Sequence, residues 1–532
     1  MANIEDDLEA TIREQVDEWS SDSNECFNIQ LLRGDGAPTA AFQPEFTYPI
    51  FGEEEKIFGY QDLDIRLSLA GHNLRPHLSI RYKKKFKAIE NVEATDIKAA
   101  LVDFLPESAF ASDSAQTAVK DEQASSFVPP GEKIHEYSRD GKQYEIWVST
   151  LADPRAKELL ENMQILVPMF IEGGSTLQLE QDWTVQRWKL FLLYEVDPVT
   201  SSDATSSPYS LVGYGTSYRV FTFPDRKDSS QTPLATFTPA AQDIDSFLPP
   251  TESEVPNAYA PTVHANSVTS PLDLPSRERL SQFLILPPHQ KGGHGAELYN
   301  CMYKHLTTPE NIQEFTVEDP NEAFDDLRDI CDLVQLRDNS AFAVLKINTT
   351  LTTEQLQSDP SIPTALIVPS APRETIRKTT KIMPRQFDRL VEMHTLSLIP
   401  PAHRSRNRIT RKLKASNDND KAYYLWRLYV KARLYVFNRD QLIQVEREER
   451  VEKLEAALDG VVEKYVELLE RVDKAEERGG GRGAEERQSV GGAKVARKRK
   501  VVEDDEGDEE DGDEVMGGTN GANGHKKARA ER

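Results

Sequence analysis

The sequence predicts a mixed α/β protein with a mostly-β N-terminal domain and a helical C-terminal region. Short runs with strand-like alternation dominate up to about residue 150. Between residues 151 and 345 the expected order includes strand, strand, insertion, strand, glycine-rich loop, helix, strand and helix, which is typical of a mixed α/β core. From residue 346 onward, apolar residues recur with helical spacing.

The chain has 532 residues, more than one hydrophobic core usually supports, so we expect two to four domains. Hydrophobic residues make up 38% and charged residues 29%, which favours folded domains joined to disordered segments. The expected segments are a disordered N-terminus (1–25), an N-terminal domain (26–150), a core (151–345) with a disordered insertion (224–276), a helical region (346–475) and a disordered tail (476–532).

Local patterns place individual elements within these segments. Alternation predicts strands in the N-terminal domain, and longer apolar runs predict a helix followed by two buried strands in the core. The expected strands lie at 42–48, 64–70, 77–82, 144–148, 188–196 and 210–223, the loop at 106–130, and the helix at 154–171.

The formal net charge of −25 argues against nucleic-acid binding through a basic surface and favours a basic partner. Cys26, Cys301 and Cys331 are too far apart for a disulfide framework or a zinc site, so we expect a reducing compartment and no metal. The N-terminus has no secretory signal, and the most apolar stretch, 163–171, is far too short to span a membrane. The sequence therefore predicts a soluble intracellular protein.

A heptad pattern marks residues 451–472. A helix with this pattern can pack into a local bundle or form an intermolecular coiled coil, and three heptads favour the local bundle without excluding the other. The apolar positions, spaced by three and four residues, are Val451, Leu454, Leu458, Val461, Tyr465, Leu468 and Val472.

The sharpest chemical pattern is the run Gln290 to Ala296, QKGGHGA, which follows a buried strand and opens a helix. Glycines let a ligand approach the backbone, and the free N–H groups at a helix start bind phosphate. No G-K-[ST] follows, and Leu298 stands where a dinucleotide-binding fingerprint needs its third glycine. The run by itself therefore indicates a phosphate-binding loop of another kind.

Two carboxylates, Glu318 and Asp319, lie where a predicted strand ends and a helix begins. Strand ends of this kind are where α/β proteins place reactive groups. The alternative is that Asp319 only caps the helix, with Pro320 at its first position and Asn321 beyond. A cap does not need Glu318.

These two segments, QFLILPPHQKGGHGAELY and FTVEDPNEAFDDLRD, closely resemble the catalytic core of the type B histone acetyltransferase catalytic subunit, within the GNAT superfamily of N-acetyltransferases. FTYPIFGEEEKIFGYQDLDIRL (46–67) looks like the same family's N-terminal domain, and RQFDRLVEM (385–393) like its C-terminal helix. The resemblance covers about residues 26–400 apart from the insertion. It implies an acetyltransferase core with a splayed central sheet.

The resemblance also implies acetyl-CoA as co-substrate and assigns residues to it. Strand backbone groups of Phe283, Leu284 and Ile285 would hold the pantetheine arm, and Asn321 would contact the cofactor from the next helix. The pyrophosphate would be held by Gln290, Lys291, Gly292, Gly293, His294, Gly295 and Ala296.

For catalysis the resemblance makes Glu318 the general base, with Glu172 and Asp319 near the substrate lysine. Forming the neutral amine of a free lysine at pH 7 costs about 4.6 kcal/mol, which a nearby carboxylate offsets by accepting the proton. We expect the neighbouring carboxylates to raise the pKa of Glu318. Transfer would be direct, because Cys301, the conceivable acyl carrier, looks like a core residue of a helix.

The histone tail would lie on a surface formed by Glu53, Glu54, Glu55, Tyr218, Arg219 and Val220. By resemblance the substrate is newly made histone H4 (with H3), and the partner is a WD40 β-propeller histone-binding subunit. The basic run 494–500 reads as a nuclear localisation signal or a solvated tail, and the acidic run 503–514 binds histones or only solubilises. We expect nuclear and cytoplasmic locations. The open alternatives are an acetyltransferase of another amine and a non-catalytic acidic histone chaperone.

Overall fold

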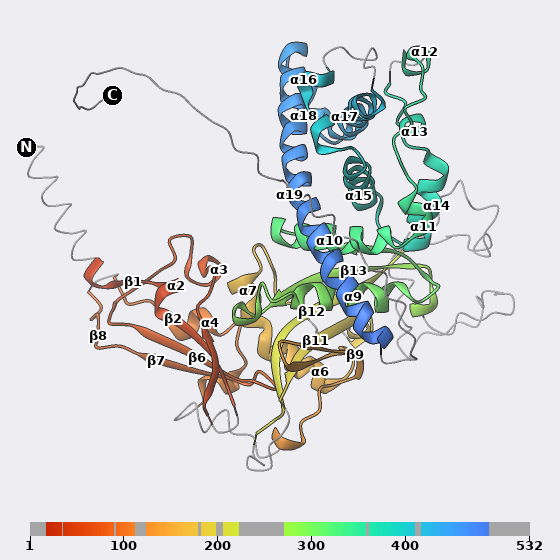
Figure 1. The fold of residues 1–532 in the computed structure, drawn as a ribbon. Coiled ribbons are helices and arrows are strands. Elements are labelled where there is room, and N and C mark those ends of the chain that lie inside the picture. Colours follow the sequence, from red (N-terminus) through yellow and green to blue (C-terminus); the bar gives the residue numbers. More distant parts are fainter. Residues whose placement is uncertain are drawn as a thin grey trace, which may run out of the picture. The chain divides into compact units, whose positions relative to one another are not determined.

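A computed structural model describes residues 17–33, 36–89, 92–111, 124–178, 182–197, 206–222, 271–357, 361–409 and 417–488 (Figure 1). The chain divides into two compact units, 1–477 and 478–532, and the second is described only where a helix continues to Gln488. The insertion expected at 224–276 lies mostly outside the described residues. Its last part is ordered, as a 3-10 turn at Pro271–Asp273 and the first residue of a strand at Ser276.

The N-terminal domain is built on a four-stranded sheet in the order β3-β2-β6-β7. Strands β2 and β6 run parallel and the other neighbours antiparallel. Alternation explains the packing, since Phe27, Ile29 and Leu31 are buried against one core. The elements are β1 Ser20–Asp22, α2 Ser23–Cys26, β2 Phe27–Leu32, β3 Pro38–Phe42, α3 Tyr48–Phe51, β4 Lys56–Phe58, β5 Tyr60–Gln61, β6 Asp64–Ala70, β7 Pro76–Arg81, β8 Lys84–Lys85 and α4 Ile97–Leu101.

Three expectations for this region need comment. The strands expected at 64–70 and 77–82 are confirmed as β6 and β7. The strand expected at 42–48 is wrong, because β3 ends at Phe42 and Tyr48 begins a helix. Order also begins before residue 26, since β1 pairs with β4 and Asp22 caps α2 by accepting from two backbone N–H groups.

The core is a six-stranded sheet in the order β14-β13-β12-β11-β10-β9, antiparallel except for the parallel pair β13 and β14. Strand β10, which contains the strand expected at 144–148, and β9, which was not expected, belong to this sheet, so the core begins at Glu132 rather than at residue 151. Local alternation does not reveal which sheet a hairpin joins. The strands are β9 Glu132–Arg139, β10 Lys142–Thr150, β11 Trp188–Val196, β12 Tyr209–Phe221, β13 Ser276–Ile285 and β14 Ile312–Val317.

Both faces of the core sheet are covered. Along β11, Phe191 and Leu193 join the cluster under α9 (His294–Thr307) and α10 (Glu322–Arg337), while Leu192 and Tyr194 join the cluster shared with the N-terminal domain. A strand buried on both faces reads as a continuous apolar run, as WKLFLLYEV does. On the second face lie α6 (Pro154–Met163), the 3-10 turn Gln164–Leu166 and α7 (Val167–Phe170).

The C-terminal region is helical, and its heptad side chains pack inside the same unit. Leu458, Tyr465 and Leu468 are buried in the cluster that also contains residues of α9 and α10, as the local-bundle interpretation expects, while Val451 at the start of the pattern is exposed. The last helix continues past residue 476, where disorder was expected. The helices are α11 Ser340–Ala343, α12 Thr353–Gln357, α13 Thr364–Ile367, α14 Ser370–Thr380, α15 Pro384–Ser397, α16 Arg406–Ile409, α17 Asp418–Phe437, α18 Arg439–Leu442 and α19 Arg447–Gln488.

A buried carboxyl group joins three of these helices. Asp332 of α10 accepts hydrogen bonds from the Tyr299 hydroxyl of α9 at 2.8 Å and from Nε2 of Gln386 of α15 at 3.1 Å. Burial raises the pKa of Asp332 to about 7. At pH values between the ordinary aspartate pKa and 7, the folded chain therefore holds a proton here that the unfolded chain releases.

Replacing Asp332 by Asn should change how stability depends on pH. Because the folded state binds the extra proton, this group makes the unfolding free energy fall as pH rises through that window, by at most about 1.4 kcal/mol per pH unit. In Asp332→Asn this contribution disappears, so the urea midpoint of the wild type should fall more steeply between pH 5 and pH 7. Equal slopes for the two proteins would contradict the assignment.

Candidate active site

The site is organised by the point where β13 and β14 part. Their last backbone contact is the Glu318 N–H, which donates to the Leu280 carbonyl oxygen at 2.9 Å. Beyond it β13 continues to Ile285, while β14 has ended at Val317. On its other side β13 carries a bulge, because Leu280 and Phe283 lie opposite Ser217 and Gly215. Among the described residues, no strand pairs with the β14 side of β13 from Ser281 to Ile285, so the two strands diverge there and leave a gap in the sheet.

A tight loop follows β13 and leads into α9. Lys291 and Gly293 both have left-handed backbone conformations, with φ of 59° and 82°. Gly293 is the N-cap residue and supplies no side-chain acceptor to the first turn of α9. A Cβ atom at Gly293 would lie 2.6 Å from Nη1 of Arg139, so glycine is required there for space as well as conformation. The helix therefore begins with backbone N–H groups available to an anion.

Arg139 of β9 ties this loop to the far edge of the sheet. Its guanidinium donates to the Gly292 carbonyl at 2.5 Å and to Oε1 of Glu297 at 3.0 Å. Gln290 closes the loop from the other side, because its Nε2 donates to the Ile285 carbonyl at 3.0 Å. The side chains of Arg139 and Gln290 thus hold the loop in shape.

His294 is turned into the protein. Its Nδ1 lies 2.7 Å from the Tyr137 hydroxyl, and its ring packs on Tyr144. Burial lowers the pKa of His294 to about 4, so the imidazole is neutral at physiological pH. A phosphate contact from this residue would come from its backbone N–H. Of the other loop residues, Lys291, Gly292 and Gly293 are exposed and Ala296 packs against the core.

Glu318 is held from two directions. The Tyr218 hydroxyl of β12 donates to its Oε1 at 3.0 Å, and the Ser281 hydroxyl of β13 donates to its Oε2 at 2.8 Å. Nη1 of Arg279 lies 3.6 Å from Oε1, and the carboxylate side chain remains 36% exposed. Burial raises the pKa of Tyr218, which keeps its hydroxyl protonated as a donor. The carboxylate is oriented and still open to solvent.

Sequence reasoning missed Ser281 and Arg279. The available signal was the polar pair Ser281–Gln282, which interrupts the apolar run of a buried strand. Its meaning depends on the end of β14, which lies 36 residues farther along the chain at Val317 and which local pattern does not place beside it.

The cap of α10 is Asn321, whose side chain accepts from the Phe324 N–H at 2.9 Å. The alternative in which Asp319 caps this helix is therefore wrong. Asp319 is exposed, has a left-handed φ of 33°, and lies near enough to Arg279 to interact with it electrostatically. The four residues 318–321 thus separate β14 from α10, with Glu318 at the start and the cap Asn321 at the end.

Glu172 lies in an exposed turn after α7. The turn is fixed to β13, because Nε2 of the buried Gln282 donates to the Ser175 carbonyl at 2.9 Å. Gln282 is the neighbour of Ser281, which contacts Glu318. The structure therefore brings the turn of Glu172 to the same strand segment that holds Glu318, with Asp319 adjoining.

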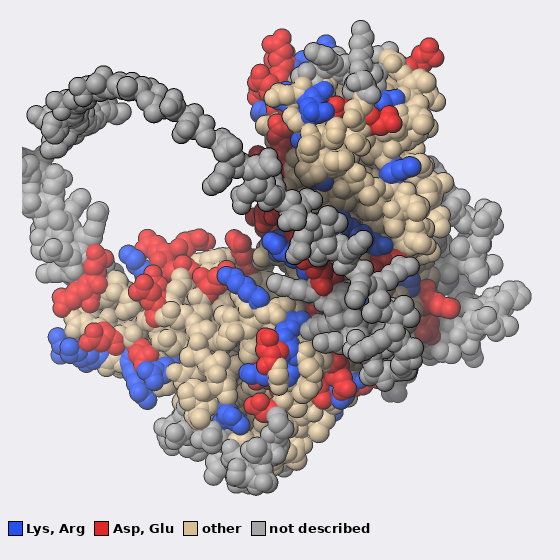
Figure 2. Space-filling view, in the orientation of Figure 1, with Lys and Arg blue, Asp and Glu red and all other residues tan. Residues whose placement is uncertain are grey.

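The expected tail surface divides into structural and accessible residues. Glu55 is engaged internally, since its Oε1 accepts from the backbone N–H groups of Thr47 and Tyr48 at 2.6 and 3.1 Å. Glu53 and Glu54 are exposed. Figure 2 shows acidic side chains gathered over the part of the N-terminal domain that carries β1, α2 and α3. This face is therefore negative whether or not Glu55 takes part.

On β12, Arg219 is also structural. Its guanidinium contacts the fully buried Glu278 at 3.0 Å and donates to the Leu272 carbonyl at 2.5 Å. Val220 is half-buried beside it. Of the three residues expected on this strand, Tyr218 is the one that reaches Glu318.

The thiol of Cys301 is poorly suited to carry an acyl group. Burial raises the pKa of Cys301 to about 12, so this thiol stays protonated and is a poor nucleophile. Within the described ranges, no group of three or more His, Cys, Asp or Glu side chains is placed to hold a metal ion. None of the helices described is long and apolar enough to cross a membrane.

Comparison with known proteins gives consistent matches. Residues 19–172 match the family model described as Histone acetyl transferase HAT1 N-terminus. Proteins named histone acetyltransferase type B catalytic subunit match over most of the chain. The one from Aspergillus fumigatus is 38% identical, covering 88% of this chain and 80% of its own length. The one from Emericella nidulans is 39% identical (87% and 91%), and the one from Cryptococcus neoformans is 33% identical (86% and 98%).

These three matches cover 86–88% of this chain and 80–98% of the relatives' own lengths. The activity named for these relatives uses histone substrates and implies acetyl-CoA as co-substrate. The chain belongs to the family of type B histone acetyltransferase catalytic subunits and is an acetyltransferase.

Proposed function

We propose that this enzyme transfers the acetyl group of acetyl-CoA directly to lysine ε-amines in the N-terminal tail of newly synthesised histone H4 (with H3). Glu318 acts as the general base. The observation that carries the proposal is the pair of hydrogen bonds from Tyr218 and Ser281, which orient the Glu318 carboxylate beside the gap where β13 and β14 part.

The residues around the gap fit acetyl-CoA. The unpaired edge of β13 offers backbone groups of Phe283 and Ile285 to the amides of a pantetheine arm, while those of Leu284 between them point toward β12. The start of α9 offers N–H groups to the pyrophosphate, with Lys291 exposed beside them. Asn321 lies at the start of α10, where its amide nitrogen can reach a ligand while its oxygen caps the helix. When bound, acetyl-CoA supplies a thioester carbonyl carbon as the electrophile.

Glu318 removes the first obstacle, the charge on the substrate lysine. Each carboxylate oxygen accepts one hydrogen bond and keeps a lone pair for the ε-ammonium proton, directly or through water. The neutral nitrogen then forms the C–N bond as the C–S bond breaks. The second nitrogen proton leaves with the departing thiolate, which completes the balance without an acyl-enzyme. Because hydrogen-bond donors hold Glu318 from two strands, little reorganisation is needed at the moment of reaction.

A cationic tail suits the charge of this surface. Glu53, Glu54, Glu172 and Asp319 are exposed, with Asp319 directly after Glu318 and Glu172 in the turn anchored to β13, in a chain of net charge −25. Long-range attraction raises the local concentration of a lysine-rich peptide and falls as salt rises. A lysine-rich tail carries several positive charges and gains more from such a field than a small amine with a single charge.

Partner and location remain part of the proposal. A WD40 β-propeller histone-binding subunit would present the tail, and the enzyme would act in both nucleus and cytoplasm. The basic run 494–500 and the acidic run 503–514 lie outside the described residues, so their sequence alone supports import and histone binding.

Replacing Glu318 by Gln should lower kcat for acetylation of an H4 tail peptide by roughly 100- to 10,000-fold, because an amide cannot accept the proton. The measurement is transfer of radiolabelled acetyl from acetyl-CoA to the peptide. Acetyl-CoA binding by calorimetry should be unchanged, since the carboxylate lies on the lysine side of the gap.

Two results would count against this assignment. Transfer by Glu318→Gln within about threefold of the wild type would remove Glu318 as the base. A wild-type enzyme that binds acetyl-CoA and acetylates a small amine but not the peptide would replace the histone substrate with another amine.

Replacing Gly293 by Ala should weaken acetyl-CoA binding. The new Cβ meets Arg139, which must move and release the Gly292 carbonyl. Gly141→Ala is a matched control, because Gly141 has a similar φ of 78° and its Cβ would meet nothing within 4 Å. Both variants should lose about 1 kcal/mol of stability from backbone strain. Only Gly293→Ala should raise the Kd of acetyl-CoA, and equal Kd values for the two variants would contradict the role of this loop.

A further inference from the structure

Helix α10 connects the active site to the helical region. It begins at Glu322, four residues after Glu318, and its first turn forms the wall opposite the unpaired edge of β13. Phe324 packs edge-on against Phe283 of that edge, with ring centroids 5.0 Å apart, and also against Tyr299 of α9. The position of this turn therefore sets the width of the gap between β13 and α10.

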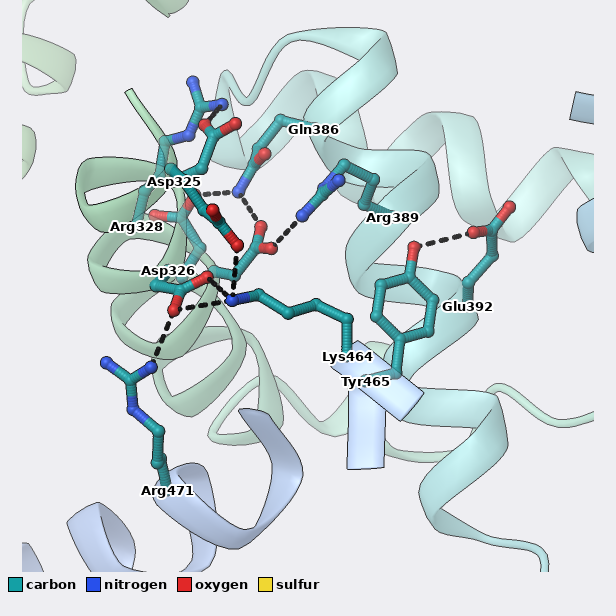
Figure 3. Close-up of polar contacts among 12 residues, drawn as sticks. Asp325, Asp326, Arg328, Gln386, Arg389, Glu392, Lys464, Tyr465 and Arg471 are labelled. Carbon is teal, nitrogen blue, oxygen red and sulfur yellow. Dashed lines mark hydrogen bonds and ion pairs between the residues drawn. The ribbon is translucent and has the colours of Figure 1, made fainter. Parts of the chain in front are cut away.

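The next turn of α10 is held by the C-terminal helix. Asp326, largely buried, accepts from Nζ of Lys464 at 3.0 Å and from Nη1 of Arg471 at 2.7 Å (Figure 3). Lys464 also contacts Oε1 of Glu322 at 3.0 Å. Lys464 and Arg471 are seven residues apart, two helical turns, so they project from the same face of α19. Their two charges converge on one carboxylate.

Neighbouring contacts join α19 to α15 and α15 to α10. The hydroxyl of Tyr465, adjacent to Lys464, donates to Oε2 of the buried Glu392 of α15 at 2.8 Å (Figure 3). One turn along α10 from Asp326, the buried Asp329 pairs with Arg389 and accepts from Gln386 at 2.9 Å. The start of α10 is thus held by charged groups of two helices that are distant in sequence.

The carboxylate in these contacts is shielded from water, while the side chains of Lys464 and Arg471 are 29% and 43% exposed. Asp326 is 11% exposed in its side chain, and charge-assisted hydrogen bonds to a largely buried carboxylate gain more than exposed pairs. Removing the cations would leave a poorly solvated charge without compensation, which favours movement of α10 toward water. The contact therefore has the strength to fix the helix.

We propose that Lys464 and Arg471 are positioning residues for the co-substrate: by holding Asp326 they keep the first turn of α10, with Asn321 and Phe324, in place against Phe283. The inference rests on the proposed binding of acetyl-CoA in the gap. If the contact is broken, the first turn occupies other positions for part of the time. The apparent Kd of acetyl-CoA then rises in inverse proportion to the fraction of molecules whose first turn is in the binding position.

The effect should fall on affinity rather than on chemistry. Glu318 is fixed by Leu280, Ser281 and Tyr218, which belong to β12 and β13 and do not depend on α19. Loss of the α19 contact therefore leaves the base oriented. At saturating acetyl-CoA, kcat and its pH profile should stay as in the wild type.

The experiment compares the full-length wild type with Asp326→Asn and with the double variant Lys464→Gln/Arg471→Gln. Calorimetry gives the Kd of acetyl-CoA, and peptide acetylation gives KM and kcat. We expect both variants to raise Kd and KM by roughly three- to thirtyfold, the usual range for coupling between distant groups, with kcat changed less than about twofold. One variant removes the charge on α10 and the other removes the charges on α19. An equal rise of Kd in both assigns the effect to the ion pair between these helices. Should the double variant fail to fold, Asp326→Asn decides alone.

Glu476→Gln is the matched control. It weakens the contact of Arg337 with Glu476, which joins the same two helices at 3.0 Å. At a rise of about 1.5 Å per residue, Arg337 lies about 17 Å farther along α10 than Asp326. Its Kd should equal that of the wild type. An equal rise in Glu476→Gln would show a general docking role and overturn the proposal, as would an unchanged Kd in Asp326→Asn. A wild type that does not bind acetyl-CoA would instead overturn the proposed function.

Discussion

The structure depends on one backbone hydrogen bond, the Glu318 N–H to the Leu280 carbonyl, because it is the last one between two parallel strands that then separate. Everything at the site is defined from this point. Glu318 is the first residue past β14, and Ser281 is the first residue of β13 without a partner on the β14 side. The glycine loop and α10 follow the two strands after they diverge. A sheet that remained paired would have no room for a ligand between its strands.

Rigid surroundings allow the strands to part without loss of order. The sheet is buried on both faces, and α9, α10 and the helical region share one hydrophobic cluster with β13 and β14. The polar groups near the gap are mostly tied down, as Arg139, Gln290 and Gln282 show. The exposed groups, Lys291, Asp319 and Glu172, stand out because their neighbours are committed to structure. The side chains that stabilise the fold near the gap and the side chains open to solvent there are therefore different residues.

The sequence predicted the parts of the site that are local in the chain. The glycine loop before α9, the carboxylate after β14 and the splayed α/β core follow from motif, order and resemblance. Contacts between strands could not be predicted. Arg279 and Ser281 lie beside Glu318 only because of the register of β13 with its neighbours, and the sequence of the β9–β10 hairpin does not show which sheet it joins. Glu55 and Arg219 were expected to contact the substrate, but both bind groups inside the protein. The charge of a residue does not show whether the fold places a binding partner for it in the interior.

The tether from Arg139 to the Gly292 carbonyl has a consequence for how the enzyme acquires its activity. The two residues are 153 positions apart, so the loop cannot adopt its final shape until β9 and β13 have entered one sheet. Non-local pairing of this kind is slow, because a long loop must close before any contact rewards it. During synthesis at about 5–20 residues per second, the N-terminal domain can be complete for many seconds while the glycine loop is still unformed. The final shape of the glycine loop is therefore among the last features that the folding chain gains.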